Sequence, residues 1–500
     1  MSTMDVVTFR PPQGCRGEDG PAFQGNFRKG ELRGIIHINK DNCVGCDTCR
    51  KFCPVDAISG GLGAIHKIRD DACVSCGQCL SACPFGAIEQ MSFVDDVIAA
   101  LKDPKKFVVA HPSPAVRVAL AEEFGGKPGD LCTDQMLNAL EKAGFTVYDV
   151  NQTADQTILE EGTEFIKKVR YWCLGERSPE VNMMAHHPLP HFTSCCPGWV
   201  RNMEINFASA IPHVSTTKSP IQMGGALGKT WAAKHVWNKD PRDVCIVSIT
   251  PCTAKIFEAS RPEFIDAWKW NVEHNVIPKD SPVFPDIDYS LTTRDIAEVF
   301  RRLGIDPLKM PTTHEVKPTE KYTGAGTIFG CSGGVMEAAL RTAYALLAGE
   351  ELKNPDIISV RGLNNSLVEA TVPIPLKAQG GKIFELRVAV VNGALQDLKN
   401  VMKIINEDKD RWHFIEVMNC PGGCVNGGGQ PQVRGSVRNF TDVRAIRAKA
   451  LYDNDAAKPI RKSHENPAIQ QLYKEYFGEP GSHKAHEVLH TTYVKRVINK

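Results

Sequence analysis

The stretch Glu416–Pro431 reads EVMNCPGGCVNGGGQP, and the interpretation of the rest of the chain depends on it. It holds Cys420 and Cys424 at a C-x3-C spacing among five glycines. Cysteine thiolates are the usual protein ligands of iron–sulfur clusters, and glycine lets the backbone come close to a bulky inorganic group. A glycine-rich surface turn with two incidental cysteines would give the same pattern. The stretch alone therefore leaves a metal centre and a surface turn both open.

Two further cysteine segments favour the metal centre. One is Thr193–Trp199, TSCCPGW, with two adjacent cysteines, and the other is Pro251–Glu258, PCTAKIFE. Together with Glu416–Pro431 they resemble the three active-site signatures of FeFe hydrogenases. The resemblance runs from about residue 110 to the C-terminus. It implies a catalytic domain built around an organometallic iron centre.

Composition limits the protein class and its partners. A chain of 500 residues with 42% hydrophobic residues predicts a globular protein of several domains. The net charge of +1 gives no reason to expect nucleic acid or an anionic membrane as partner, and no apolar run approaches the roughly 20 residues of a membrane helix. The N-terminal sequence shows neither an apolar signal core nor a twin arginine, which predicts a cytoplasmic protein. Because disulfides are rare in that compartment, the 18 cysteines indicate metal binding.

An internal repeat follows the N-terminal segment. Asp41–Pro54 reads DNCVGCDTCRKFCP, and Asp71–Pro84 reads DACVSCGQCLSACP. Each is the C-x2-C-x2-C-x3-C-P run of a bacterial two-cluster ferredoxin, in which the fourth cysteine binds the other run's 4Fe–4S cluster. Zinc is disfavoured, because zinc motifs seldom carry four cysteines followed by proline. The predicted ligands are Cys43, Cys46, Cys49 and Cys83 for one cluster, and Cys73, Cys76, Cys79 and Cys53 for the other.

The predicted fold class is α+β with several domains. Residues 1–34, which include Cys15, should form an extended arm, and residues 35–92 a ferredoxin-like domain with two 4Fe–4S clusters. In that domain each cysteine run should lead into a helix ending near Ala57 or Ala87. The resemblance implies that residues 93–435 form a two-lobed α/β H-cluster domain, with strands at 384–391 and 412–418. It also implies that residues 436–500 form a helical wrap, which is a separate small subunit in some relatives; helices are expected at 437–452 and 466–477.

The resemblance also implies a cofactor and its ligands. In the family, the H-cluster is a 4Fe–4S cubane joined through one cysteine to a diiron unit with CO, cyanide and azadithiolate ligands, and dedicated maturases insert that unit. By motif, the cubane ligands are Cys196, Cys252, Cys420 and Cys424, with Cys424 as the bridge. Lys255 should donate to a cyanide ligand, and the pocket should be lined by Pro114, Ala115 and Met418.

A proton path is implied as well. Cys195 is spared from ligation, and a thiol with an unperturbed pKa of about 8.5 could exchange protons after modest tuning. The resemblance implies that it serves the azadithiolate nitrogen and that protons leave through Glu164, Ser215 and Glu161, in that order. Glu161 and Glu164 lie on one face of a predicted helix, where the default interpretation is a solvated surface pair.

Some positions lie outside these motifs or depart from the family pattern. The segment between Val169 and His191 is longer than in relatives, and we interpret His186, His187 and His191 as loop histidines rather than metal ligands. Thr250 stands where methionine is usual, and Cys331 where alanine is usual. Both should approach the diiron pocket.

The expected activity is reversible H2 oxidation and proton reduction, with electrons exchanged with ferredoxin through the two N-terminal clusters. Three alternative functions would each need other features. A sensory homologue would usually carry extra signalling modules, and an electron-bifurcating NAD subunit would need partner chains, while no Rossmann fingerprint is present. A hydrogenase-like iron–sulfur assembly protein would lack an intact pair like Cys195–Cys196.

Overall fold

The computed structural model describes residues 28, 30–363, 366–393, 395–433 and 435–498. Most of the predicted N-terminal arm, including Cys15, lies outside these residues. The last part of that segment is held by the opposite end of the chain. Glu31 forms an ion pair with Arg496 at 2.8 Å, and both side chains are almost completely buried.

The ferredoxin-like domain contains two antiparallel strand pairs and two short helices. β1 (Ile36–Ile38) pairs with β4 (Ile88–Gln90), and β2 (Ile58–Ser59) pairs with β3 (Lys67–Ile68). The helices are α1 (Thr48–Lys51) and α2 (Gln78–Ala82).

The prediction of helices ending near Ala57 and Ala87 is wrong, because both helices stop before the proline that follows the fourth cysteine. Cys83 is extended, with φ −71° and ψ 114°. Proline disfavours the helical region for the residue before it, and this ends α2. Ala57 and Ala87 instead stand directly before β2 and β4.

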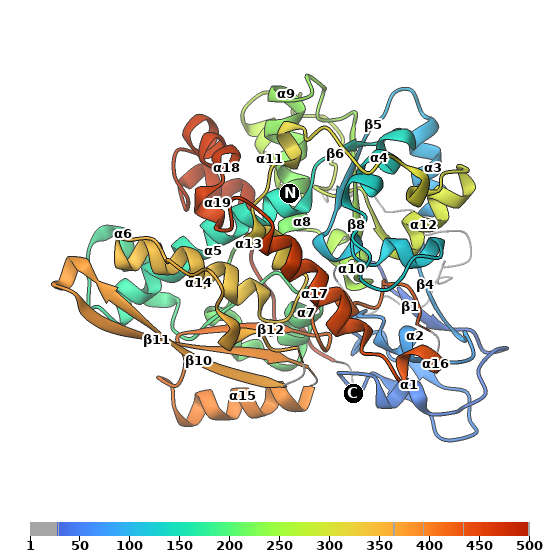
Figure 1. Ribbon diagram of the computed structural model, residues 1–500, viewed down its shortest axis with the longest axis horizontal. Coiled ribbons are helices and arrows are strands. Elements are labelled where there is room, and N and C mark those ends of the chain that lie inside the picture. Colours follow the sequence, from blue (N-terminus) through green and yellow to red (C-terminus); the bar gives the residue numbers. More distant parts are fainter. Residues whose placement is uncertain (1–27, 29, 364–365, 394, 434, 499–500) are drawn as a thin grey trace.

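One catalytic lobe is built on a parallel sheet of order β6-β5-β8-β9. The strands are β5 (Phe107–Pro112), β6 (Thr146–Val147), β8 (Val244–Thr250) and β9 (Tyr289–Thr292). Every residue of β8 is buried, as expected for a strand covered on both faces. Helices α3 (Val94–Lys102), α4 (Thr133–Lys142) and α12 (Thr293–Arg302) belong to this lobe, on the right of Figure 1.

The other lobe has a mixed sheet of order β10-β11-β12-β7. The predicted strands at 384–391 and 412–418 are confirmed as β11 (Lys382–Asn392) and β12 (Phe414–Met418). β12 runs parallel to β7 (His191–Phe192), and β11 forms an antiparallel hairpin with β10 (Leu367–Leu376). Helices α5 (Val150–Trp172) and α14 (Gly334–Ala348) lie on one side of this sheet and α15 (Leu395–Glu407) on the other (Figure 1).

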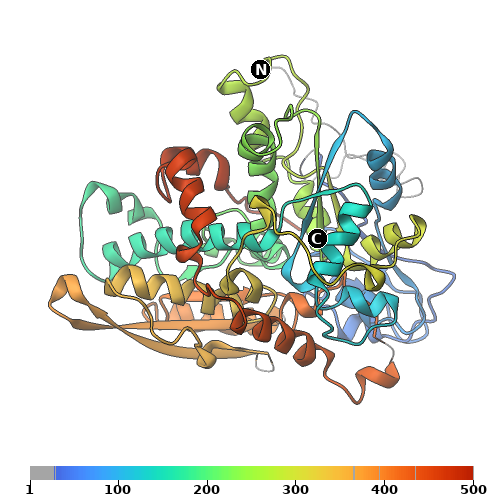
Figure 2. The ribbon, with the colours of Figure 1, turned by 45° about the horizontal axis from the view of Figure 1, so that its top comes forward.

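The C-terminal segment is helical, as predicted, but more broken. The helix expected at 437–452 is two helices, α16 (Gly435–Arg438) and α17 (Val443–Ala456), because Asp442 caps the start of α17. α18 (Pro467–Leu472) continues into a π-helical turn at Tyr473–Phe477, and α19 (His483–Leu489) follows. Figures 1 and 2 show this segment lying across the two lobes. Among the described residues, no helix has the length and apolar character that crossing a bilayer demands.

Candidate active site

Four loops converge on one pocket between the lobes. Each loop follows the carboxyl end of a parallel strand, namely β5, β7, β8 or β12, which is where open α/β sheets usually place ligands. The structure therefore brings together the segments that sequence analysis singled out. The lining includes Pro114, Ala115, Cys195, Cys196, Thr250, Cys252, Lys255, Met418, Cys420 and Cys424.

The glycines of Glu416–Pro431 let neighbouring backbones pack against this loop. A Cβ at Gly427 would lie 2.1 Å from the carbonyl oxygen of Pro251, and one at Gly428 would lie 2.2 Å from that of Cys76. Gly423 has φ +88°, and its Cβ would lie 2.5 Å from the backbone nitrogen of Ser332. Sequence reasoning assigned the glycines to contact with an inorganic group. In the structure they allow the backbones of four segments to pack closely together.

The four signature cysteines suit an iron cluster. None of the described cysteines forms a disulfide. Burial raises the pKa of Cys252 to about 12 and the pKa values of Cys420 and Cys424 well above the ordinary thiol range. Positive charge from bound iron is what would stabilise several thiolates in such surroundings. The donor set therefore fits a cubane.

The N-terminal cysteines form two groups, each with three cysteines from one run and one from the other. Cys43, Cys46, Cys49 and Cys83 line one cavity. In the second group, Cys53 and Cys73 pack beside Cys76, and all three add to the effect of burial in raising the pKa of Cys79. These are the two sets that the ferredoxin pattern predicts.

The second group lies between the first group and the signature pocket. Cys49 of the first group helps to raise the pKa of Cys79 in the second group. Cys76 of the second group has the largest effect of any neighbouring thiol on the pKa of Cys420 in the pocket. Hydrogen bonds join the ferredoxin-like domain to the catalytic domain at this point. Gln78 Nε2 donates to the carbonyl of Asn426 at 2.8 Å, and Thr253 Oγ1 donates to the carbonyl of Ser75 at 2.6 Å. The three cysteine groups thus form a series that ends at the pocket.

Lys255 reaches the pocket wall as part of a buried ion pair. Its Nζ donates to Glu258 Oε2 at 2.8 Å and to the carbonyl oxygen of Cys195 at 3.2 Å. Burial opposes the charge, but Glu258 outweighs it and raises the pKa of Lys255. Ser219 Oγ also donates to Glu258, at 3.0 Å. Sequence reasoning did not select Glu258 as a site residue, although its i,i+3 spacing from Lys255 on α10 (Ala254–Ala259) was a usable signal.

Glu161 and Glu164 are buried, contrary to the default for a polar helix face. Neither carboxyl oxygen of Glu161 makes a hydrogen bond of normal geometry among the described residues, and His191 Nε2 lies 3.7 Å from Oε1. Burial raises the pKa of Glu161 to about 8, and the charge of Glu164 adds to the rise. Glu161 therefore holds a proton at neutral pH.

Glu164 has the opposite character. Its Oε2 accepts hydrogen bonds from Ser215 Oγ at 2.9 Å and from the backbone of Thr216 at 3.0 Å. Burial would raise its pKa, but Lys168, whose Nζ lies 3.5 Å away, and neighbouring histidines lower the pKa to about 2. Two acids with pKa values pushed apart are typical of proton-transfer sites.

Of the two acids, Glu161 has the larger electrostatic effect on Cys195. Burial raises the pKa of the Cys195 thiol well above its ordinary value. The charge of Glu161 adds more to this rise than that of any other neighbouring group. Glu164 accepts a hydrogen bond from Ser215. The sequence-based order of Glu164, Ser215 and Glu161 outward from Cys195 instead places Glu164 next to the thiol. The shift in the pKa of Cys195 is larger than the modest one expected, and its thiol is protonated at neutral pH.

Two histidines have surroundings that sequence reasoning missed. His191 was interpreted as a loop residue, but it is completely buried in β7. His490 of the C-terminal segment lies with Nδ1 2.7 Å from Thr216 Oγ1 and Nε2 3.1 Å from Glu160 Oε2. The sequence separation of 274 residues between Thr216 and His490 left no local signal. His186 and His187 remain in the connecting segment, as predicted.

Family comparisons agree with this geometry. The 4Fe-4S dicluster domain family matches residues 36–91, the C-terminal domain of the iron-only hydrogenase large subunit matches residues 106–428, and the iron hydrogenase small subunit matches residues 441–496. The chain belongs to the iron-only hydrogenase family. As a member it has 4Fe–4S clusters in the dicluster domain and an H-cluster in the hydrogenase domain.

Individual relatives support the same assignment. The NADP-reducing hydrogenase subunit HndD of Solidesulfovibrio fructosivorans is 38% identical over 94% of this chain and 76% of that protein. The periplasmic Fe hydrogenase large subunit of Nitratidesulfovibrio vulgaris is 43% identical, over 80% of this chain and 87% of that one. A variant of the FeFe-hydrogenase HydA1 from Chlamydomonas reinhardtii aligns with a TM-score of 0.66 at 35% identity, over 81% of this chain and all of that one.

The iron-only hydrogenase pocket includes one of the two departures from the family pattern. Thr250 lines the pocket, and its Oγ1 donates to the carbonyl of Cys252 at 2.9 Å. Cys331 is not among the lining residues, but it packs against Ala115 and Cys424, which are. Its side chain is buried and also packs against Leu451 of α17.

Proposed function

We propose that this iron-only hydrogenase interconverts H2 with protons and electrons, and that it exchanges the electrons with ferredoxin or a similar small redox protein. The observation that carries the proposal is the Cys195–Cys196 pair. One of these cysteines joins Cys252, Cys420 and Cys424 around the pocket, and the other lies beside a buried, protonated acid, Glu161.

The proposed roles follow the position of each side chain. Cys196, Cys252, Cys420 and Cys424 would hold the cubane, with Cys424 as the bridge to the diiron unit. Lys255 would present its ammonium group to an anionic ligand, because Glu258 keeps it charged in a buried place. Pro114, Ala115 and Met418 would line the wall. When bound, the H-cluster supplies a two-electron store and an open metal site, while the protein orients and insulates it.

The proposed proton path begins at the Cys195 thiol. Glu161 would return a proton to Cys195 and receive one from the Ser215–Glu164 side. Glu161 is protonated and Glu164 ionised at neutral pH, so this pair can hold one transferable proton between them. The direction of transfer then depends only on whether H2 is consumed or produced.

The path has a continuation in the C-terminal segment. Thr216 Oγ1 lies 3.4 Å from Glu164 Oε2 and 2.7 Å from His490 Nδ1. His490 contacts Glu160, which also accepts a hydrogen bond from the hydroxyl of Tyr473. The ring of His490 lies 4.0 Å from that of His486, a partly exposed residue. A histidine in this place can pass a proton between its two nitrogens.

Replacing His490 with glutamine is expected to slow H2 turnover by about threefold to tenfold, less than the loss of a group adjacent to the cluster. Glutamine keeps hydrogen-bonding capacity toward Thr216 and Glu160 but cannot relay a proton. Turnover with a dye electron donor measures the effect. His274→Gln, at an exposed site, is the control. Unchanged turnover in His490→Gln would confine the path to Glu164 and solvent.

The proposed electron path runs through the two ferredoxin-like cysteine groups. The outer group is bordered by the exposed apolar side chains of Val44 and Phe85, which suit a transient contact with a redox partner. Insertion of the diiron unit would require maturases.

A second candidate function is iron–sulfur cluster assembly. Protein NAR1 of Arabidopsis thaliana is 27% identical over 80% of each chain. The buried acids behind Cys195 and the charged Lys255 in the pocket favour hydrogenase chemistry, because an assembly protein has no need of a proton path. An H2 assay separates the two. Protein made with maturases should evolve and consume H2, and protein made without them should do neither.

A further inference from the structure

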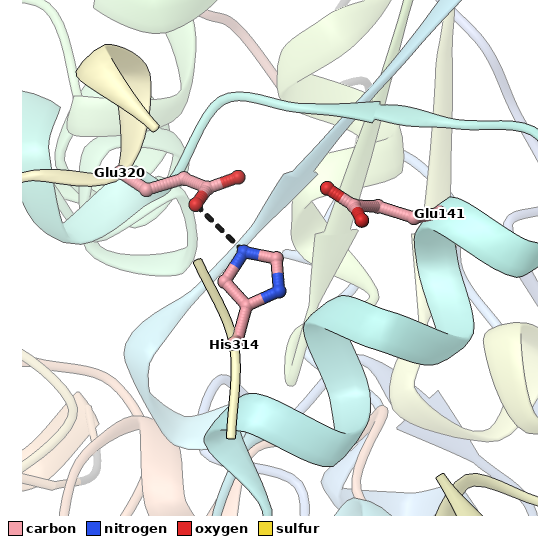
Figure 3. A group of neighbouring side chains, drawn as sticks. All are labelled: Glu141, His314 and Glu320. Atoms are coloured by element: carbon pink, nitrogen blue, oxygen red, sulfur yellow. Dashed lines mark hydrogen bonds and ion pairs between the residues drawn. The ribbon is translucent and has the colours of Figure 1, made fainter. Parts of the chain in front are cut away.

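A buried histidine–glutamate pair lies outside the hydrogenase pocket, on the lobe that carries α4. His314 and Glu320 come from the segment before α13 (Gly324–Ile328), and Glu141 lies near the end of α4. Figure 3 shows the three side chains turned toward one space. One nitrogen of His314 and one oxygen from each carboxylate all lie within 4.8 Å of one another.

The tautomer of His314 is set by Asn138, which precedes Glu141 on α4. The Asn138 amide nitrogen donates to the carbonyls of Pro311 and Thr313, at 2.9 Å each. Its oxygen must therefore be the atom that lies 3.0 Å from His314 Nδ1. An amide oxygen only accepts hydrogen bonds, so Nδ1 carries the proton.

The other ring nitrogen of His314 then faces an acceptor. Nε2 lies 2.8 Å from Glu320 Oε2, which also accepts a hydrogen bond from the backbone of Lys317 at 2.9 Å. A neutral imidazole protonated on Nδ1 presents a lone pair here, and so does the carboxylate. A positive centre must stand between them, either a second proton or a metal ion.

The second oxygen of Glu320 points independently to a metal ion. The Glu320 side chain is 1% exposed, and Oε1 has no hydrogen-bond partner among the described residues. In Figure 3 this oxygen is directed toward Glu141 across the space between them. A buried carboxylate oxygen without a partner is destabilising, and an added proton on His314 would not reach it. A cation between Glu141 and Glu320 would reach this oxygen and compensate its charge.

We propose that Glu141, His314 and Glu320 bind a divalent transition-metal ion of the Zn²⁺ class. An imidazole nitrogen with two carboxylates suits such ions, and the Asn138 contact resembles the outer hydrogen bond that orients most metal-binding histidines. Lys317 forms an ion pair with Glu141. Its side chain is 45% exposed, so it can turn to solvent as the ion enters. The bound ion would join α4 to the segment that leads into α13.

The test uses cluster-loaded, anaerobic, full-length protein, so that the cluster cysteines are already occupied. Equilibrium dialysis against buffered Zn²⁺, with metal analysis, counts the bound zinc, and X-ray absorption at the zinc edge identifies its ligand atoms. We expect one zinc per chain with nitrogen and oxygen neighbours. Glu320→Gln and Glu141→Gln should each weaken binding by about tenfold or more. Glu141 is partly exposed, so Glu141→Gln should fold even if the buried change Glu320→Gln disrupts the protein.

The chain offers a matched control. Glu351, His464 and Glu465 also lie within 4.8 Å of one another, but they are more exposed, and both acids pair with Lys462. His464→Gln should leave zinc binding unchanged. The proposal is overturned if Glu141→Gln and Glu320→Gln bind zinc as the unmodified chain does, if His464→Gln abolishes binding, or if sulfur is a zinc neighbour.

Discussion

Replacing Cys195 with alanine is expected to lower H2 turnover by about 10²- to 10⁴-fold, the usual contribution of a positioned proton-transfer group. The thiol lines the pocket but is not one of the four proposed cubane ligands. Burial and the neighbouring Glu161 raise its pKa, so the thiol carries a proton at neutral pH and can donate it. Alanine removes the proton and leaves the ligand set intact.

The readouts are turnover and the infrared bands of the diiron unit, measured on the same preparation. The variant should keep the bands and lose the turnover. Cys173→Ala is a matched control, because this thiol is exposed at the end of α5. Loss of the bands in Cys195→Ala would make Cys195 a ligand or a structural residue. Turnover close to that of the unmodified protein would show that protons enter elsewhere.

Replacing Glu161 with glutamine should also lower turnover by about two orders of magnitude or more. Glutamine has nearly the same shape, but it cannot carry a proton between Cys195 and the Ser215–Glu164 pair. The pH dependence of stability gives an independent readout. Burial raises the pKa of Glu161 from 4.5 to about 8, so its contribution to stability is complete below pH 4.5 and is lost as the pH rises through 8.

Glu161→Gln should therefore lose less thermal stability than the unmodified protein between pH 5 and pH 8. Glu298→Gln, at a partly exposed site of α12, is the control for both measurements. A normal rate in Glu161→Gln would remove this residue from the path. An unchanged pH dependence of the melting temperature would mean that Glu161 is ionised in the folded protein.

Much of the site could be predicted because its information is local. The spacing within Asp41–Pro54 and Asp71–Pro84 predicted which cysteine crosses to the other group, and the structure groups them in that way. The strands before Cys252 and Cys420 could be read from their apolar runs. The two strands belong to different sheets, so the meeting of their loops depends on how the lobes pack and could not be read from these runs.

The features that sequence reasoning missed depend on contacts between distant segments. His490 meets Thr216 across 274 residues, and nothing near His490 in the sequence indicates this. Burial of Glu161 depends on how α5 packs, and its polar face alone suggested the opposite. β10 was not predicted, because Pro373 and Pro375 interrupt its strand pattern and many of its residues are partly exposed.

The infrared spectrum of the protein, made with and without maturases, tests most directly the claim that this pocket holds a working H-cluster. With maturases, the account predicts bands from metal-bound CO and cyanide, together with H2 turnover. Without maturases, it predicts the signals of 4Fe–4S clusters but neither bands nor turnover. Fully matured protein with intact cubane signals and no CO or cyanide bands would contradict the account.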